Sequence, residues 1–262
     1  MSDLVEKIII RKRKEIEAKR SLESFSALYR RIKDLPYLHH FPFPPPEERG
    51  IMAEVKRASP SKGILFPRDG VETLAREYEE SGAFAISVVT EDKFFLGSVD
   101  DFKKIRECIC LPLLRKDFII DEYQILESKH FGADALLLIA SLLSLQELKK
   151  FISMAGELGM AAVVEVHTVG ELEKALASEA KVIGINNRNL RTFAVDLNTS
   201  KKLLPLVPEK KIKIVESGIR KEKDLLSFDG FRVNAFLIGE ALLTSPQPGE
   251  KLRNFCSVLR RK

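Results

Sequence analysis

The stretch ALLLIASLLSLQELKKFISMAGELGMAAVVEV, residues 135–166, contains two apolar runs separated by a helical pattern. Residues 135–139 and 161–166 are short and almost continuously apolar, as strands buried on both faces are. Between them, apolar side chains recur at helical spacing over residues 145–158, and Gly159 stands where that helix should end. The stretch therefore predicts one β–α–β unit with parallel strands.

The same alternation continues on both sides of this stretch, from Gly50 onward. Strands are expected at residues 51–55, 83–89, 112–114, 135–139, 161–166, 182–185, 212–215 and 235–238. Amphipathic helices are expected at residues 72–80, 99–108, 122–130, 145–158, 169–176, 200–204, 221–227 and 249–259. Eight such units in about 210 residues fit an α/β fold of the (β/α)8 TIM barrel type, which usually has ~250 residues. The alternative is an open doubly wound sheet, but KRASP (56–60) follows the first strand where that fold more often has a glycine-rich turn.

The first 47 residues precede this pattern and predict an N-terminal helical extension. Residues 3 to about 33 have a helical pattern that includes the basic run RKRK (11–14). Acidic residues follow this run at once, so we interpret it as a solvated helix face rather than a nucleic-acid arm. FPFPPP (41–46) breaks any helix and predicts a stiff, extended connector. We therefore expect two parts, an extension with a proline-rich connector at residues 1–47 and a catalytic barrel at residues 48–262.

The composition excludes several classes of protein. The chain has 262 residues, of which 45% are hydrophobic and 31% charged, an ordinary balance for a folded domain. No apolar run approaches the roughly 20 residues of a membrane helix, and the N-terminus has neither a secretory signal core nor an acid-poor transit peptide. The net charge of +5 arises from mixed signs along the chain, so neither a nucleic-acid nor a membrane partner is expected. Three cysteines, at positions 108, 110 and 256, match no zinc spacing and predict free thiols in a reducing cytoplasm.

Polar side chains follow five of the predicted strands at the point where each strand ends. They are Glu54 and Lys56, Lys116 within LRKDF (114–118), Glu165 with His167, Asn186 with Arg188, and Glu216 with Ser217. The carboxyl ends of the strands of a barrel meet at one mouth, where active sites lie. Charged side chains are rare inside a barrel unless they are paired or functional. The sequence therefore predicts a charged active site at this mouth.

A different signal follows the last two strands. Gly218 comes after the seventh strand, and Gly239 precedes a helical pattern that begins at about Glu240. Glycine lets backbone N–H groups approach an anion closely, and a helix N-terminus adds a favourable dipole. Because barrels commonly bind phosphate at these two loops, a phosphorylated substrate is expected.

Taken together, these residues resemble the indole-3-glycerol phosphate synthase family. The matching segments are AEVKRASPSKG (53–63), LLRKDF (113–118), VEVH (164–167), GINNRNL (184–190), ESGI (216–219) and IGEAL (238–242). The first segment is the most specific, because phosphate-binding glycines recur in many barrels. The resemblance covers essentially the whole chain, including an N-terminal helical extension of the length found in the family.

The resemblance implies a decarboxylating carbon–carbon lyase of tryptophan biosynthesis. Its substrate, 1-(2-carboxyphenylamino)-1-deoxyribulose 5-phosphate, closes a carbon–carbon bond, loses carbon dioxide and then water, and leaves indole-3-glycerol phosphate. Lys116 is implied as the general acid that protonates the ketone oxygen, with a pKa lowered by burial and neighbouring cations. Glu165 is implied either to stabilise positive charge on the anilino nitrogen or to act as a base there. Glu54 and Lys56 are implied to serve the dehydration, with Lys56 also contacting substrate anions.

The resemblance also implies the substrate contacts. Arg188 is expected to pair with the substrate carboxylate or phosphate, and Asn186 and Ser217 with sugar hydroxyls. Glu216 is expected to orient neighbouring side chains, and Ser59 to contact a substrate anion. The backbone N–H groups of Gly218, Gly239 and Glu240 are expected to bind the phosphate. Phe95 and Phe118 are expected to form an apolar wall for the aromatic ring. The Glu240 side chain is expected to point away from the phosphate, and Phe95 is equally compatible with core packing. No metal is expected at His167, which lacks a second histidine at ligand spacing, and the family needs no cofactor.

Two alternatives stay open at this stage. One is another phosphate-binding barrel enzyme, such as a phosphosugar isomerase or a Schiff-base aldolase, which Lys116 would also suit. The other is a basic binding module built from residues 11–14 and 260–262, which leaves the strand-end charges unexplained. The sequence does not settle the oligomeric state, although a monomer is favoured.

Overall fold

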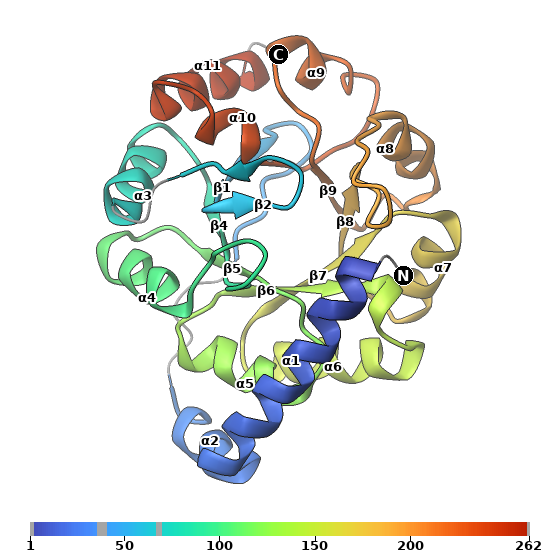
Figure 1. Cartoon of the computed structure of the whole chain (residues 1–262). Helices are drawn as coiled ribbons and strands as arrows, with labels where there is room; N and C mark the ends of the chain where they lie inside the picture. The colour runs from blue at the N-terminus through green and yellow to red at the C-terminus, as the bar shows by residue number, and fades with distance from the viewer. Residues whose placement is uncertain (1–2, 36–40, 67–69, 261–262) are drawn as a thin grey trace.

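The computed structural model describes residues 3–35, 41–66 and 70–260 of the chain. Its centre is a closed barrel of eight parallel strands with helices around the outside (Figure 1). In order around the barrel, the strands are β1 (Gly50–Val55), β10 (Ala235–Ile238), β9 (Ile212–Glu216), β8 (Val182–Asn186), β7 (Ala161–Val166), β6 (Ala135–Ile139), β5 (Leu113–Lys116) and β4 (Ala85–Val89). The predicted (β/α)8 barrel is confirmed.

Side chains alternate between the two faces of each strand and form two apolar clusters. The inner cluster fills the barrel and includes Met52, Ala85, Leu114, Leu137, Val163, Val182, Ile214 and Leu237. The outer cluster joins the strands to the helices and includes Ile51, Ile86, Leu136, Val164, Ile183, Val215 and Phe236. Because both faces are buried, the strands are apolar runs without polar alternation, which is why they were recognisable in the sequence.

The helices that cover the barrel are close to those predicted. They are α3 (Val71–Glu80), α4 (Val99–Cys108), α5 (Glu122–His130), α6 (Leu145–Glu157), α7 (Val169–Ala177), α8 (Asn198–Leu203), α9 (Glu222–Leu226), α10 (Glu240–Leu243) and α11 (Pro248–Arg260), with short 3-10 turns η1 (Ala140–Leu142) and η2 (Leu204–Leu206). Side chains cap several helix starts. Ser144 and Glu147 form a capping box at α6, for example, and Thr168 accepts a hydrogen bond from the backbone N–H of Glu171 at α7. No helix within the described ranges is long and apolar enough to span a membrane.

The prediction of one N-terminal helix is wrong, because the segment forms two. Helix α1 (Asp3–Leu22) ends before Ser24, which has extended backbone and accepts a hydrogen bond from the backbone N–H of Ala27. Ser24 thereby caps a second helix, α2 (Phe25–Ile32). The helical periodicity runs through both helices, so the pattern alone did not reveal this break. Of the basic C-terminal residues, only Arg260 lies within the described part.

Helix α1 runs from the barrel mouth outward past α5, and α2 lies beside α5 at the outside of the molecule (Figure 1). Three ion pairs join α1 to the β5–α5 region: Lys12 with Asp117 at 3.0 Å, Lys19 with Glu127 at 2.6 Å, and Arg20 with Asp121 at 2.6 Å. The apolar side of α1 reaches further, because Val5 and Ile8 pack with residues of the inner cluster. Helix α1 therefore forms part of the mouth.

The strand ends differ from the prediction in one systematic way. Strands β5, β8 and β9 continue beyond their apolar runs to Lys116, Asn186 and Glu216. Their hydrogen-bonded ladders persist, with Val89 opposite Lys116 and Asn186 opposite Glu216. A short hairpin of β2 (Ala58–Ser59) and β3 (Gly63–Ile64), which the sequence did not predict, follows β1. Lys116, Asn186 and Glu216 are thus held at the ends of regular strands rather than on loops.

Candidate active site

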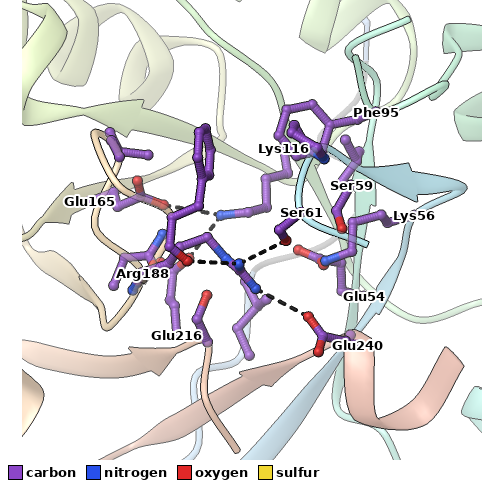
Figure 2. Close-up of a pocket in the computed structure, with 18 of the residues that line it drawn as sticks. Glu54, Lys56, Ser59, Ser61, Phe95, Lys116, Glu165, Arg188, Glu216 and Glu240 are labelled. Carbon is purple, nitrogen blue, oxygen red and sulfur yellow. Dashed lines mark hydrogen bonds and ion pairs between the residues drawn. The ribbon is translucent and has the colours of Figure 1, made fainter. Parts of the chain in front are cut away.

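A cavity opens at the carboxyl-terminal mouth of the barrel and contains the predicted site (Figure 2). Fourteen predicted residues line it: Glu54, Lys56, Ser59, Phe95, Lys116, Phe118, Glu165, Asn186, Arg188, Glu216, Ser217, Gly218, Gly239 and Glu240. These residues come from segments far apart in the sequence. The barrel therefore brings together all the residues that the sequence proposed for catalysis and binding.

Lys116 lies at the centre of the charged residues. Its Nζ donates to Oε2 of Glu216 at 2.8 Å and to Oε2 of Glu165 at 3.1 Å. The three side chains come from β5, β9 and β7 and project into the barrel from different sides (Figure 2). Both carboxylates are almost fully buried, whereas 18% of the Lys116 side chain stays accessible from the cavity. Lys116 is therefore the member of the cluster that a substrate in the cavity can reach.

The charge state of Lys116 differs from the expectation. Burial alone lowers its pKa, but the carboxylates of Glu216, Glu165 and Glu54 outweigh burial and raise the pKa above its ordinary value. The expected lowering by neighbouring cations is wrong, because anions surround this ammonium group. Lys116 is thus a charged proton donor at neutral pH.

The two carboxylates beside Lys116 have opposite pKa shifts. Burial and the charge of Glu165 raise the pKa of Glu216 to about 7, despite the attraction of Lys116. Burial also acts to raise the pKa of Glu165, but Lys116 and His167 outweigh it and hold this pKa well below its usual range. Near neutral pH the cluster therefore contains an ionised Glu165 and a Glu216 that readily exchanges a proton.

Glu54 and Lys56 form a second ion pair at the end of β1. The two residues are separated by one position, so their side chains leave the strand on the same face. Burial raises the pKa of Glu54, but Lys56 and then Lys116 outweigh it, and the net pKa is lowered. Gly239 on the neighbouring strand lies against this pair, since a Cβ there would come 2.9 Å from Cβ of Glu54. Gly239 is therefore required for the carboxylate to enter the barrel.

Arg188 links three loops across the mouth. Its Nη1 donates to Oγ of Ser61 at 3.1 Å and to the carbonyl of Phe193 at 3.3 Å, and its Nη2 donates to Oε2 of Glu240 at 3.2 Å (Figure 2). The Glu240 side chain, which was expected to point away from the phosphate, lies at the cavity with its carboxylate on Arg188. Glu240 turns toward Arg188 because the planar guanidinium attracts the nearest carboxylate as its counter-ion.

The loops after β9 and β10 have the conformation expected of a backbone anion site. Ser217 and Gly218 both have positive φ values, 62° and 91°, and helix α10 starts directly after Gly239. The buried Oγ of Ser59 faces the same cavity and has no hydrogen-bond partner within the described structure. Asn186 also lines the cavity, and its side-chain oxygen accepts a hydrogen bond from the backbone N–H of Arg188 at 2.9 Å, so the donor left on its side chain is the amide nitrogen. These groups supply donors on one side of the mouth.

Phe95 and Phe118 form an apolar wall on another side. Their ring centroids are 6.3 Å apart, and Phe95 lines the cavity while it is only partly buried, which favours the wall over core packing. Glu91 holds the loop that contains Phe95, since its carboxylate accepts the backbone N–H groups of Phe94 and Phe95 at 2.7 and 2.9 Å. Glu91 was not among the predicted site residues, although an acid two positions after an apolar strand was the available signal.

Asp117 is a second residue that sequence reasoning left without a role. It follows Lys116, is almost fully buried, and accepts hydrogen bonds from Thr90 at 2.7 Å, Arg115 at 3.2 Å and Lys12 at 3.1 Å. Asp117 thus joins β4, β5 and α1 behind the wall of the site. Two of its three partners, Thr90 and Lys12, are distant in sequence, so only its position next to Lys116 hinted at this role.

No group of three or more His, Cys, Asp or Glu side chains with metal-binding geometry occurs among the described residues. His167 instead lies between two carboxylates, with Nε2 3.3 Å from Oε1 of Glu165 and Nδ1 3.0 Å from Oε2 of Glu171.

The fold and the site define a class of protein. A parallel barrel with a buried lysine–carboxylate cluster, an apolar wall and anion-binding loops at one mouth is a (β/α)8-barrel enzyme built for acid–base chemistry on an anionic substrate. Comparison with known proteins gives the particular family. A family model described as indole-3-glycerol phosphate synthase matches residues 5–255, and the chain belongs to this family.

Curated relatives carry the same name. The chain is 52% identical over 208 residues to the indole-3-glycerol phosphate synthase of Acetivibrio thermocellus, covering 79% of this chain and 80% of that protein. It is 50% identical over 204 residues to the one from Carboxydothermus hydrogenoformans, covering 78% and 77%. The one from Dehalococcoides mccartyi is 42% identical over 262 residues, covering 95% and 98%.

Solved structures of lower identity share the fold alone. A crystal structure of KGPDC from Streptococcus mutans superposes with a TM-score of 0.63 at 16% identity, covering 81% of this chain and 98% of that one. Thiamine phosphate pyrophosphorylase from Pyrococcus furiosus superposes with a TM-score of 0.60 at 14% identity, covering 81% and 96%.

Proposed function

We propose that the cluster of Lys116, Glu165 and Glu216 carries the chemistry of the indole-3-glycerol phosphate synthase reaction, with Lys116 as general acid. The chain has the activity of its family, a decarboxylating carbon–carbon lyase of tryptophan biosynthesis that acts on a phosphorylated small molecule. The observation that carries the residue assignment is the position of the Lys116 ammonium group, between two buried carboxylates and open to the cavity.

Ring closure is the first step. The ring carbon that bears the carboxylate attacks the ketone carbon of the deoxyribulose chain, and a new carbon–carbon bond forms. The ketone oxygen gains negative charge as its π bond breaks, and Lys116 transfers a proton to it. Positive charge develops on the anilino nitrogen, which Glu165 stabilises because it stays ionised. Glu216 shares its proton with Lys116 and restores the ammonium group.

Decarboxylation and dehydration complete the reaction. The bond from the ring carbon to the carboxylate breaks, carbon dioxide leaves, and its electron pair restores the aromatic ring. The hydroxyl formed in the first step then leaves as water while a proton is lost from the substrate, which produces the indole. The Glu54–Lys56 pair serves this step, with Lys56 protonating the leaving hydroxyl and the ionised Glu54 accepting the proton that the substrate loses.

The anionic ends of the substrate select its orientation. The phosphate lies at the backbone N–H groups of Gly218, Gly239 and Glu240, Lys56 contributes a cation for the substrate anions, and Ser217 hydrogen-bonds a sugar hydroxyl. The substrate carboxylate takes the place of Glu240 on the guanidinium of Arg188, and Ser59 adds a hydroxyl donor. Asn186 donates to a sugar hydroxyl, and the anilino ring lies against Phe95 and Phe118.

The activity is tested directly by mixing the protein with 1-(2-carboxyphenylamino)-1-deoxyribulose 5-phosphate and following indole fluorescence. We expect fluorescence to grow until the substrate is consumed. Borohydride treatment in the presence of substrate provides the control for a Schiff-base mechanism, because it would trap a covalent adduct on Lys116. A folded protein that produces no indole would contradict the function, and a trapped adduct would contradict the general-acid role.

We also propose that residues 1–47 form an extension that serves substrate binding and that residues 48–262 form the catalytic barrel of a cytoplasmic, monomeric enzyme. The role of the extension in substrate binding is supported by the position of α1, whose residues Leu4, Val5 and Ile8 line the cavity.

A chain that begins at Glu48 is expected to have a KM at least about tenfold higher, because one wall of the cavity is lost. Ile8→Ala should raise KM in the same direction, since Ile8 lines the cavity and is 1% exposed. Ile10→Ala on the outer face of α1, where Ile10 is 52% exposed, is the matched control and should leave KM unchanged. Steady-state kinetics measure all three, and full substrate affinity in the shortened chain would rule out this role.

A further inference from the structure

His167 lies between the proposed catalytic carboxylate of Glu165 and Glu171 on helix α7. Its imidazole Nε2 lies 3.3 Å from Oε1 of Glu165, and its Nδ1 lies 3.0 Å from Oε2 of Glu171 on α7. The backbone N–H of His167 donates to the same oxygen of Glu171 at 2.7 Å. Only 10% of the His167 side chain is accessible, and it does not belong to the cavity lining. His167 is thus a buried neighbour of the site rather than a part of its surface.

Glu165 therefore has two cationic neighbours, one at each of its oxygens. Oε2 accepts from Lys116 on β5, and Oε1 faces His167. Burial tends to lower the pKa of His167, but the carboxylates of Glu165, an ion-pair partner, and Glu171, a hydrogen-bond partner, raise it to about 10, so the imidazole is protonated at neutral pH. The other charged groups around the pair are Glu216 on β9 and Glu54 on β1, both anionic neighbours of Lys116. Every additional anion near Glu165 makes its ionised form harder to maintain.

The proposed reaction removes one of these two cations. When Lys116 gives its proton to the ketone oxygen, it becomes neutral, and the attraction at Oε2 is lost at the moment when the anilino nitrogen needs an ionised partner. The charge of His167 does not change in this step. A second cation on the opposite oxygen is what keeps Glu165 ionised and in place.

We propose that His167 is a positioning residue, which holds Glu165 as an oriented carboxylate while Lys116 transfers its proton. Glu171 in turn fixes the imidazole ring. This inference rests on the proposed function, since it requires that Glu165 stabilise the developing positive charge.

The test compares the kcat and KM of His167→Gln with those of the wild-type enzyme between pH 3.5 and 9. The acid limb of the kcat profile reports the coupled titration of Glu165 and Glu216. Loss of the imidazolium raises the pKa of Glu165 from well below its usual range toward that range, so this limb should lie at higher pH in the variant than in the wild type. At neutral pH kcat should fall about tenfold while KM changes less than about twofold, because His167 does not line the cavity.

Two further variants separate a positioning role from a structural one. Glu171→Gln removes the outer carboxylate, leaves the imidazole in place, and should shift the acid limb in the same direction by a smaller amount. It keeps the proposal testable if His167→Gln does not fold. His130→Gln is the matched control, because His130 lies at the end of α5 and Glu165 is not among its charged neighbours, so its profile should match the wild type.

The outcomes distinguish this inference from the function on which it rests. If Glu165→Gln keeps near wild-type kcat, the proposed role of Glu165 fails, and the role of His167 fails with it. If Glu165→Gln is inactive but neither His167→Gln nor Glu171→Gln moves the acid limb by more than about 0.2 pH unit, only the inference about His167 is overturned.

Discussion

Lys116→Met is expected to lower kcat by about 1,000-fold or more, because the variant loses the cavity-exposed ammonium group that contacts both buried carboxylates. General acid catalysis contributes ~10²–10⁴ in rate, and the substitution also leaves Glu165 and Glu216 without their shared cation. Indole fluorescence under substrate saturation measures the loss directly. Substrate affinity should change far less, because the phosphate and carboxylate contacts lie elsewhere at the mouth.

The variant Lys116→Arg tests whether Lys116 acts by transferring a proton or only by its positive charge. The guanidinium keeps a cation between the two carboxylates, so folding should be preserved, but its delocalised charge is not given up in proteins, so it does not transfer a proton to the substrate. We expect this variant to remain at least about 100-fold below the wild type. Lys149→Met, an exposed position on α6, is the control and should have wild-type kcat. Equal rates for Lys116→Met and the wild type would transfer the acid role to Lys56.

Asp117→Ala is expected to lower the free energy of unfolding by about 3 kcal/mol, because it leaves two buried cations without their counter-ion. Asp117 pairs with Lys12 at 3.0 Å and with Arg115 at 3.2 Å, and all three side chains are buried. In the variant, Arg115 still has an ion-pair partner in Glu127 at 3.7 Å, and Lys12 still has one in Glu15 at 3.6 Å. The expected loss of stability is therefore at the lower end of the range for a broken buried ion pair. Urea denaturation measures it.

The pH dependence of stability provides a second readout for Asp117. Burial acts to raise its pKa, but Lys12 and Arg115 outweigh burial and hold the pKa well below its usual range. Because the pKa of Asp117 is lower in the folded state than in the unfolded state, ionised Asp117 stabilises the fold. This contribution to the free energy of unfolding is fully present above the unfolded-state pKa of ~3.9 and is progressively lost as the pH falls below that value. The difference in stability between wild type and variant should therefore shrink in acid.

Asp92→Asn is the matched control for this prediction. Asp92 also pairs with a cation of α1, Arg11, but half of its side chain is exposed. A surface pair of this kind contributes ~0–1 kcal/mol. An Asp117→Ala variant that loses no more stability than Asp92→Asn would show that the buried network is not a significant source of stability.

Much of the fold was predictable because a buried parallel barrel imposes a simple pattern. Both faces of each strand are covered, so every strand is a short apolar run, and every helix between strands has one apolar face. The residues at the strand ends were recognisable for a related reason, since a charge at or near the end of such a run, as at Glu54, Lys116 and Glu165, is costly in an apolar interior unless it is paired or functional. The break between α1 and α2 was missed because one serine cap does not disturb the helical period.

The sequence by itself determined the barrel, the mouth at which its polar residues gather, and the family to which they belong, because these depend on residue types at local spacings. Only the tertiary structure decided how the charges pair. Three carboxylates from separate strands raise the pKa of Lys116, where cations had been expected, and Glu240 turns toward Arg188. Asp117 joins α1 to the wall of the site across more than a hundred residues of chain. Electrostatic interactions depend on distances between side chains, and for residues far apart in sequence those distances are set when the barrel closes.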